Sequence, residues 1–195
     1  VTIKTGVEVG KDITIEELRK QGYKAFYIAI GCQGGRKAGI PGEDAEGVMT
    51  AVDFLREVND KEEYPIEGDV VVIGGGAVGL DVVEFFAPRG AEVSIVEMMP
   101  AIGRDLDPVT KNDTKCMMEK YNVNQLTSTA LQEVKEDCFV VKSPEGEVYE
   151  LPFDHGFVCL GMRAQSKVYE EVSKAYKDTN VRVENIGDSV RARRI

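Results

Sequence analysis

The clearest pattern of apolar positions lies at the centre of the chain. Residues 69–73 are an almost uninterrupted apolar run, which is typical of a strand buried on both faces of a parallel sheet. Glycines follow, and a helix is predicted over residues 77–87, ended by Pro88 and Gly90. A second apolar run predicts a strand over residues 92–96. This order indicates a βαβ unit.

The pattern changes after this unit. An aspartate followed by a proline predicts the start of a helix over residues 107–121. Residues 122–151 show short extended runs with a hairpin turn at 143–146, and residues 156–161 resemble a further strand that ends in glycine. The centre of the chain therefore predicts a compact α/β domain with a β-meander.

The flanking segments carry further elements. Thr14 and Glu17 have the spacing of a capping box for a helix over residues 15–21. Apolar residues at helical spacing predict a helix over residues 47–58. The other predicted elements are strands over 2–9, 25–30 and 181–186 and a helix over 166–176. Residues 1–31 and 181–195 have no obvious place in the central domain.

The glycines after the first central strand have the spacing of a dinucleotide-binding turn. Gly74 allows a tight turn, Gly76 lets a pyrophosphate approach the backbone, and Gly79 lets the helix pack closely on the strand. The N–H groups at the start of the helix favour a bound phosphate. The predicted cofactor-binding residues of this turn are Gly74, Gly75, Gly76, Ala77, Val78 and Gly79. The fold class predicted is α/β with a Rossmann-like domain; a glycine-rich turn in another α/β protein is the alternative.

Glu97 ends the second central strand and indicates which dinucleotide is bound. A carboxylate there accepts both ribose hydroxyls of NAD and repels the 2′-phosphate of NADP, which usually needs an arginine nearby. The first cation that follows is Arg104, which we place too far along the chain. We therefore predict NADH as the cofactor, and a solvated acid at a strand end is the alternative for Glu97.

Composition and charge argue against two classes of binding partner. The chain has 195 residues, of which 43% are hydrophobic and 30% charged, and a formal net charge of −10. This acidic balance argues against nucleic acid or an anionic membrane as a partner, because both need a basic surface. No apolar run approaches the length of a membrane span.

Cysteine and histidine positions argue against several kinds of site. Cys32, Cys116, Cys138 and Cys159 are widely spaced and form no Cys-x-x-Cys, so neither a close redox dithiol nor a cysteine-bound zinc is supported. Free thiols suit the reducing cytoplasm, where we place the protein. Cys138 and Cys159 are predicted to be core residues. His155 is the only histidine, and we predict a structural role for it and no metal site.

Several motifs now resemble those of flavoprotein oxidoreductases that bind two dinucleotides. Residues 27–31 and 39–42 resemble the crossover from their FAD domain into their NAD domain. Residues 72–81 resemble the NAD fingerprint, residues 160–163 the strand that leaves that domain, and residues 186–188 the second FAD motif. The resemblance implies an intact protein that uses both NAD(H) and FAD.

Two subgroups match parts of the chain. Residues 186–195 resemble the NADH:flavin oxidoreductases of the 2,4-dienoyl-CoA reductase and 2-enoate reductase type, whereas residues 42–59 resemble the glutamate synthase small subunit. We favour the first group, because Glu97 suits NADH and the tail matches well.

The resemblance also implies domains and further site residues. It divides the chain into a partial FAD-binding domain (1–40), an NAD(H)-binding domain (41–165) and a return to the FAD-binding domain (166–195). It assigns three residues to FAD, namely Gly31, Gly187 and Asp188. The family often has an acid at the position of Asp81, near the contact of nicotinamide and flavin. Asp81 is therefore the candidate catalytic residue, with an ordinary helix acid as the alternative.

The predicted last strand of the domain adds two residues. Ligands of a doubly wound sheet sit at the carboxyl ends of its strands. We place residues 156–161 beside the first central strand, so Leu160 and Gly161 are expected to border the nicotinamide ribose.

One departure from the family sets the functional expectation. Only residues 1–68 precede the NAD fingerprint, and no second fingerprint lies among them. We therefore expect a fragment that binds NADH and delivers its hydride to FAD only with the rest of its own flavoprotein. For its assembly, a homo-oligomer is left open beside a monomer. The alternatives are a stand-alone NAD-binding or sensing module and, more weakly, a dehydrogenase that uses His155.

Overall fold

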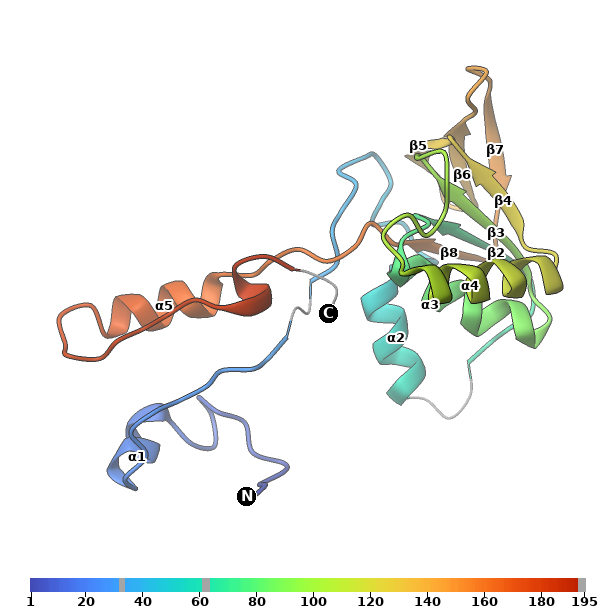
Figure 1. Cartoon of the computed structure of the whole chain (residues 1–195). Helices are drawn as coiled ribbons and strands as arrows, with labels where there is room; N and C mark the ends of the chain where they lie inside the picture. Colours follow the sequence, from blue (N-terminus) through green and yellow to red (C-terminus); the bar gives the residue numbers. More distant parts are fainter. Residues whose placement is uncertain (32–33, 61–63, 193–195) are drawn as a thin grey trace. The chain divides into compact units, whose positions relative to one another are not determined.

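The computed structural model describes residues 1–31, 34–60 and 64–192, so Cys32 and the last three positions of the tail lie outside the described residues. The chain divides into two compact units, Val1–Gly31 and Cys32–Ile195. We call them the amino-terminal unit and the sheet unit and describe each by itself (Figure 1).

A five-stranded parallel sheet forms the centre of the sheet unit (Figure 1). Its strands in spatial order are β1 (Val48–Thr50), β8 (His155–Val158), β2 (Asp69–Ile73), β3 (Glu92–Glu97) and β4 (Asn124–Thr127). Each neighbouring pair is parallel. Helix α3 (Ala77–Phe86) connects β2 to β3. The predicted βαβ unit and the α/β class are therefore confirmed.

A small antiparallel sheet follows in the sequence. It contains β5 (Ala130–Val134), β6 (Cys138–Lys142) and β7 (Val148–Pro152), in that spatial order. The N–H of Gly146 donates to the carbonyl of Ser143 at 3.0 Å and closes the turn between β6 and β7. The predicted β-meander and its hairpin turn are confirmed.

Alternate residues of β2 face two different layers. Val70 and Val72 pack in one buried cluster with Phe54 of α2 (Ala51–Asp60) and with residues of α3 and α4 (Pro108–Lys120). Val71 and Ile73 pack in a second cluster with residues of β5 and β6. Figure 1 shows the same order, with α2, α3 and α4 on one face of the parallel sheet and β5–β7 on the other. Burial on both faces explains why this strand is apolar from Val70 to Ile73.

The helix boundaries follow local signals, with one exception. Asp107 caps α4 by accepting the N–H groups of Val109 at 3.0 Å and Thr110 at 3.1 Å. The helix predicted from residue 47 begins only at Ala51, because residues 48–50 pair with β8 as β1. The open edge of β8 outweighs the helical spacing of those residues. Within the described ranges, no helix has the length and apolar character needed to cross a bilayer.

The amino-terminal unit contains one regular element, α1 (Ile15–Lys20). The predicted capping box is present: the N–H of Glu17 donates to Thr14 Oγ1 at 3.2 Å, and the N–H of Thr14 donates to Glu17 Oε2 at 2.8 Å. The strands predicted over 2–9 and 25–30 are wrong, since neither segment forms one. A strand needs a hydrogen-bonded neighbour, and the described residues of this unit provide no ladder for either segment.

In residues 166–186, as in the amino-terminal unit, the predicted helix forms and the predicted strand does not. The helix predicted over residues 166–176 is confirmed as α5 (Lys167–Ala175), although none of its residues is buried. The strand predicted over residues 181–186 is wrong, because these residues pair with no other described segment.

Candidate dinucleotide-binding site

The carboxyl ends of β2, β3 and β8 meet at one edge of the parallel sheet. Ile73 is in register with Val96 of β3 and with Val158 of β8. Just past the strand, the N–H of Gly74 donates to the carbonyl of Val96 at 2.8 Å, and the N–H of Cys159 donates to the carbonyl of Ile73 at 2.7 Å. In open α/β sheets this edge is where ligands bind.

Two glycines of the turn after β2 are required by their surroundings. Gly74 has φ +109, and a Cβ there would lie 2.4 Å from the carbonyl oxygen of Cys159. A Cβ on Gly79 would lie 1.9 Å from the carbonyl oxygen of Gly74. Any larger residue would force the turn away from β8 or α3 away from β2. The sequence fits a tight turn beneath a closely packed helix.

Gly76 differs from its neighbours because it faces open space. It is exposed, and a Cβ built on it would meet no protein atom within 4 Å. Gly76 is also the N-cap of α3, and no side chain caps the helix there. The next two positions, Ala77 and Val78, are only partly buried and begin the helix. The positive end of the helix dipole therefore faces an open position that fits a pyrophosphate.

Glu97, the last residue of β3, is half-buried and held by the backbone. Its Oε2 accepts the N–H of Gly75 and its Oε1 accepts the N–H of Met99, both at 2.7 Å. The carboxylate is thus fixed beside the glycine turn, unlike a solvated acid at a strand end. Each oxygen keeps a second acceptor direction, which fits the hydroxyls of a ribose.

The loop after β3 returns to the glycine turn. The N–H of Gly103 donates to the carbonyl of Gly75 at 2.7 Å. Arg104, which we placed too far along the chain, directly follows this contact and is exposed. No sequence signal marked Gly103 or the N–H of Met99 as part of the site.

The strand predicted over residues 156–161 ends three residues early, at Val158. Beyond it, the carbonyl of Gly161 accepts the N–H of Arg36 at 2.8 Å, and the N–H of Arg163 donates to the carbonyl of Gly34 at 3.2 Å. At residues 161–163 the chain therefore pairs with residues 34–36 and no longer with β2. Leu160 is partly buried in the cluster beside Ile73 and Val158, so Leu160 and Gly161 lie just past the binding edge.

Asp81 is exposed on α3, one helical turn from the glycine turn. Its charge acts on Cys159, but burial is the main cause that raises the pKa of this thiol to about 12. Cys159 is thus a neutral core residue and no nucleophile, and Cys138 is also buried, as predicted for both. His155 stacks on Phe86 with ring centroids 5.8 Å apart and contacts the carbonyl of Glu67. It lies at the start of β8, away from the binding edge, as a structural residue would.

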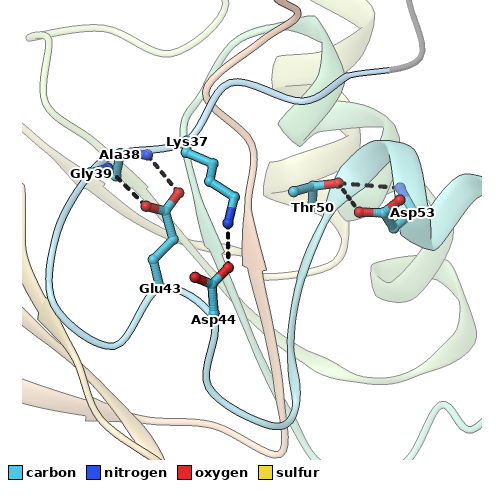
Figure 2. A network of polar contacts seen from close by, with 7 residues as sticks. All are labelled: Lys37, Ala38, Gly39, Glu43, Asp44, Thr50 and Asp53. Carbon is cyan, nitrogen blue, oxygen red and sulfur yellow. Dashed lines mark hydrogen bonds and ion pairs between the residues drawn. The ribbon is translucent and has the colours of Figure 1, made fainter.

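A group of polar side chains borders the carboxyl ends of β1 and β8 (Figure 2). Glu43 accepts the N–H groups of Ala38 at 2.6 Å and Gly39 at 2.8 Å. Thr50 donates to Asp53 at 2.7 Å at the start of α2. Lys37 forms an ion pair with Asp44, and the hydrogen bond that Lys37 donates to Asp44 is the main cause that raises the pKa of Lys37. These local contacts shape the segment that enters the sheet unit, and their carboxylates disfavour a phosphate.

The residues assigned to FAD belong to two different units of the chain. Gly31 is an exposed residue with φ +69 at the end of the amino-terminal unit. Gly187 and Asp188 belong to a 3-10 turn of the sheet unit, Gly187–Ser189. The described residues contain one glycine turn ahead of a helix, which fits one dinucleotide. The FAD assignment therefore rests on the resemblance.

Known proteins match this chain over most of its length. The sequence profile described as pyridine nucleotide-disulphide oxidoreductase matches residues 2–187. The bilirubin reductase of Mediterraneibacter gnavus (strain CC55_001C) is 35% identical over 132 residues, which are 68% of this chain and 20% of that protein. The NADH oxidase of Thermoanaerobacter brockii is 30% identical over 129 residues, 66% of this chain and 19% of that protein. The chain thus spans about a fifth of the length of these curated relatives.

A solved structure shares the fold. Histamine dehydrogenase from Rhizobium sp. 4-9 superposes with a TM-score of 0.74 at 16% identity, over 93% of this chain and 28% of that chain. At this identity the likeness concerns the fold alone.

Proposed function

Because this chain belongs to the pyridine nucleotide-disulphide oxidoreductase family, we propose that it is the NADH-binding portion of a flavin-dependent oxidoreductase. The family uses NAD(P)H and FAD, and the choice of NADH rests on one observation. Glu97 is held at the end of β3, 2.7 Å from the N–H of Gly75 in the glycine turn. In the whole protein, the reduced nicotinamide supplies a hydride and the flavin accepts it.

The residues of the sheet unit have separate tasks in this proposal. The open position at Gly76 and the start of α3 bind the pyrophosphate. Glu97 accepts the ribose hydroxyls and repels a 2′-phosphate. Leu160 and Gly161 border the nicotinamide ribose, and Asp81 orients the carboxamide.

The flanking segments supply the flavin side of the proposal. We assign residues 1–40 and 166–195 to an FAD-binding domain, with Gly31, Gly187 and Asp188 toward FAD. The exposed apolar residues of the predicted strand 25–30 and the unburied helix α5 support this assignment, because such surfaces are usually covered. The chain alone is then inactive in hydride transfer. We also propose a subtype near the 2,4-dienoyl-CoA and 2-enoate reductases, and a cytoplasmic location.

A stand-alone NAD-binding or sensing module is the second candidate. It is favoured by the completeness of the sheet unit, which buries both faces of β2 without the amino-terminal unit. Binding of FAD by the chain together with the rest of its flavoprotein would decide against this candidate.

Calorimetric titration with NADH and with NADPH tests the proposal on the wild-type chain, Glu97→Ala and Glu145→Ala. A charge-assisted hydrogen bond contributes about 1.5–3 kcal/mol, so Glu97→Ala should weaken NADH binding about ten- to a hundred-fold. The control Glu145→Ala removes an exposed acid in the turn between β6 and β7 and should change nothing. Binding of neither nucleotide, or equal binding of both, would contradict the proposal.

A further inference from the structure

Both backbone groups of Gly75, its N–H and its carbonyl, are hydrogen-bonded within the protein. Its N–H donates to Glu97 Oε2 at 2.7 Å, and its carbonyl accepts the N–H of Gly103 at 2.7 Å. The other carboxylate oxygen of Glu97 accepts the N–H of Met99 at 2.7 Å. These three bonds, which we call the Gly75 clamp, join the glycine turn, the strand-end acid and the loop after β3.

The clamp also explains why residue 75 is a glycine. Gly75 is buried. Its φ is not positive, so its backbone conformation does not require glycine. A Cβ there would lie 3.0 Å from Ile102 Cγ1 and 3.1 Å from both Cβ and Oε2 of Glu97. An added methyl group would therefore push the carboxylate or the loop away from the turn.

Gly103 is required for a different reason. It is buried, has φ +64, and a Cβ there would lie 2.8 Å from Leu106 Cδ1. Glycine adopts this left-handed backbone conformation at the lowest steric cost while the N–H stays aimed at Gly75. The loop is thus built to return to the glycine turn.

We propose that the Gly75 clamp sets the preference for NADH, with Gly75 and Gly103 as positioning residues that act through Glu97. This inference rests on the proposed function. A carboxylate that rotates freely turns away from a 2′-phosphate and relieves the repulsion, whereas a carboxylate held by two N–H donors keeps its charge in place. Specificity of this kind comes from a repulsive element as much as from an attractive one. The free acceptor directions of the held carboxylate at the same time remain aimed at the ribose hydroxyls.

Titration of Gly75→Ala, Glu97→Ala and the double variant with NADH and NADPH tests the clamp. Gly75→Ala should weaken NADH binding roughly five- to tenfold, since one hydrogen bond to a charged group is misplaced. It should not weaken NADPH binding, since the released carboxylate turns away from the 2′-phosphate. In the Glu97→Ala background the same change should leave the ratio of the two affinities unaltered. Such non-additivity identifies residues that act through one another.

Gly103→Ala provides a second route to the clamp, with Gly146→Ala as its matched control. Gly146 also has a positive φ, +92, but lies in the turn between β6 and β7 with nothing within 4 Å of a Cβ. The first variant should lower the NADH to NADPH preference, and the second should not. Equal effects of both on the preference would overturn the inference.

Amide hydrogen exchange in the nucleotide-free chain separates this inference from the proposed function. Glu97→Ala should speed exchange at the amides of Gly75 and Met99, and unchanged exchange would show that the clamp does not exist. If Gly75→Ala lowered the affinities for NADH and NADPH by the same factor, the inference would be overturned while the proposed function would stand. A wild-type chain that shows the amide protection but binds neither nucleotide would overturn the proposed function and the inference with it.

Discussion

Residues 70–73 and 25–30 are both apolar runs that lead into a glycine, yet only the first is part of a strand. The residues of the first run pair with β3 and β8, and the side chain of Val72 is 0% exposed. In the second run Tyr27 is 77% exposed and Ile30 60% exposed. The local pattern favours an extended chain in both, but only the first has neighbouring strands and two layers to cover it. A strand is therefore a property of the pair and not of the run.

The difference in burial should produce the largest effect of mutation. Phe54 is 0% exposed, with the ring of Phe157 at 4.8 Å, so Phe54→Ala should destabilise the chain by about 3–5 kcal/mol. The exposed Tyr27 offers the matched change, and Tyr27→Ala should stay within about 0.5 kcal/mol. Urea unfolding followed by circular dichroism measures both. A cost for Tyr27→Ala similar to that for Phe54→Ala would show that the second run is buried after all.

Two glycines of the turn that follows residues 70–73 allow a sharper contrast between a packing role and a binding role. Gly79→Ala places a methyl group 1.9 Å from the carbonyl oxygen of Gly74, and we expect a loss of about 3 kcal/mol of stability. Gly76→Ala meets no protein atom within 4 Å, so stability should change by less than about 1 kcal/mol while NADH binding weakens. Thermal unfolding and NADH titration together separate the two roles. Equal destabilisation by both variants would remove the distinction between a packing glycine and a binding glycine.

The smallest effect concerns a feature that the two units share. At the start of α4, the side chain of Thr110 donates a hydrogen bond that is the main cause lowering the pKa of Asp107, and the N–H of Thr110 adds to it. In α1, hydrogen bonds donated by Thr14 lower the pKa of Glu17. A lowered folded-state pKa gives stability that is present above the ordinary pKa and lost as pH falls through the lowered value. Acidification should therefore loosen both helix starts by a small amount, visible as NMR shifts of the Thr110 and Glu17 amides.

Asp107→Asn is the control for this titration. The amide side chain still accepts the N–H groups at the N-cap but carries no titrating charge. The Thr110 amide should then stop responding to acid while the Glu17 amide continues to respond. An acid response of Thr110 that survives in Asp107→Asn would contradict the assignment.

These contrasts explain how far the sequence could predict the structure. The caps at Thr14 and Asp107 and the turn at 143–146 were predictable because their contacts lie within a few residues. The βαβ unit was predictable because its apolar runs and glycines have one compatible packing. By contrast, β1 was missed because a three-residue strand depends on the open edge of β8.

The candidate site shows the same limit. The spacing of the glycines and the position of Glu97 pointed to the binding edge of the sheet, because the order of strand, turn and helix fixes where they meet. The returning loop was missed, since the bond from Gly103 to Gly75 joins positions 28 apart in the chain and leaves no periodic pattern. Contacts of this kind depend on the fold already formed.

The pairing of Gly35 with Met162 has a consequence for modularity. Residues 34–36 precede the first strand of the two sheets and residues 161–163 follow the last one, and these two stretches run side by side in opposite directions. A module whose entrance and exit are neighbours can be spliced into a surface loop of a host protein without stretching that host. The same closeness makes it suited to circular permutation, with a short linker joining the two stretches and new termini at the β6–β7 turn.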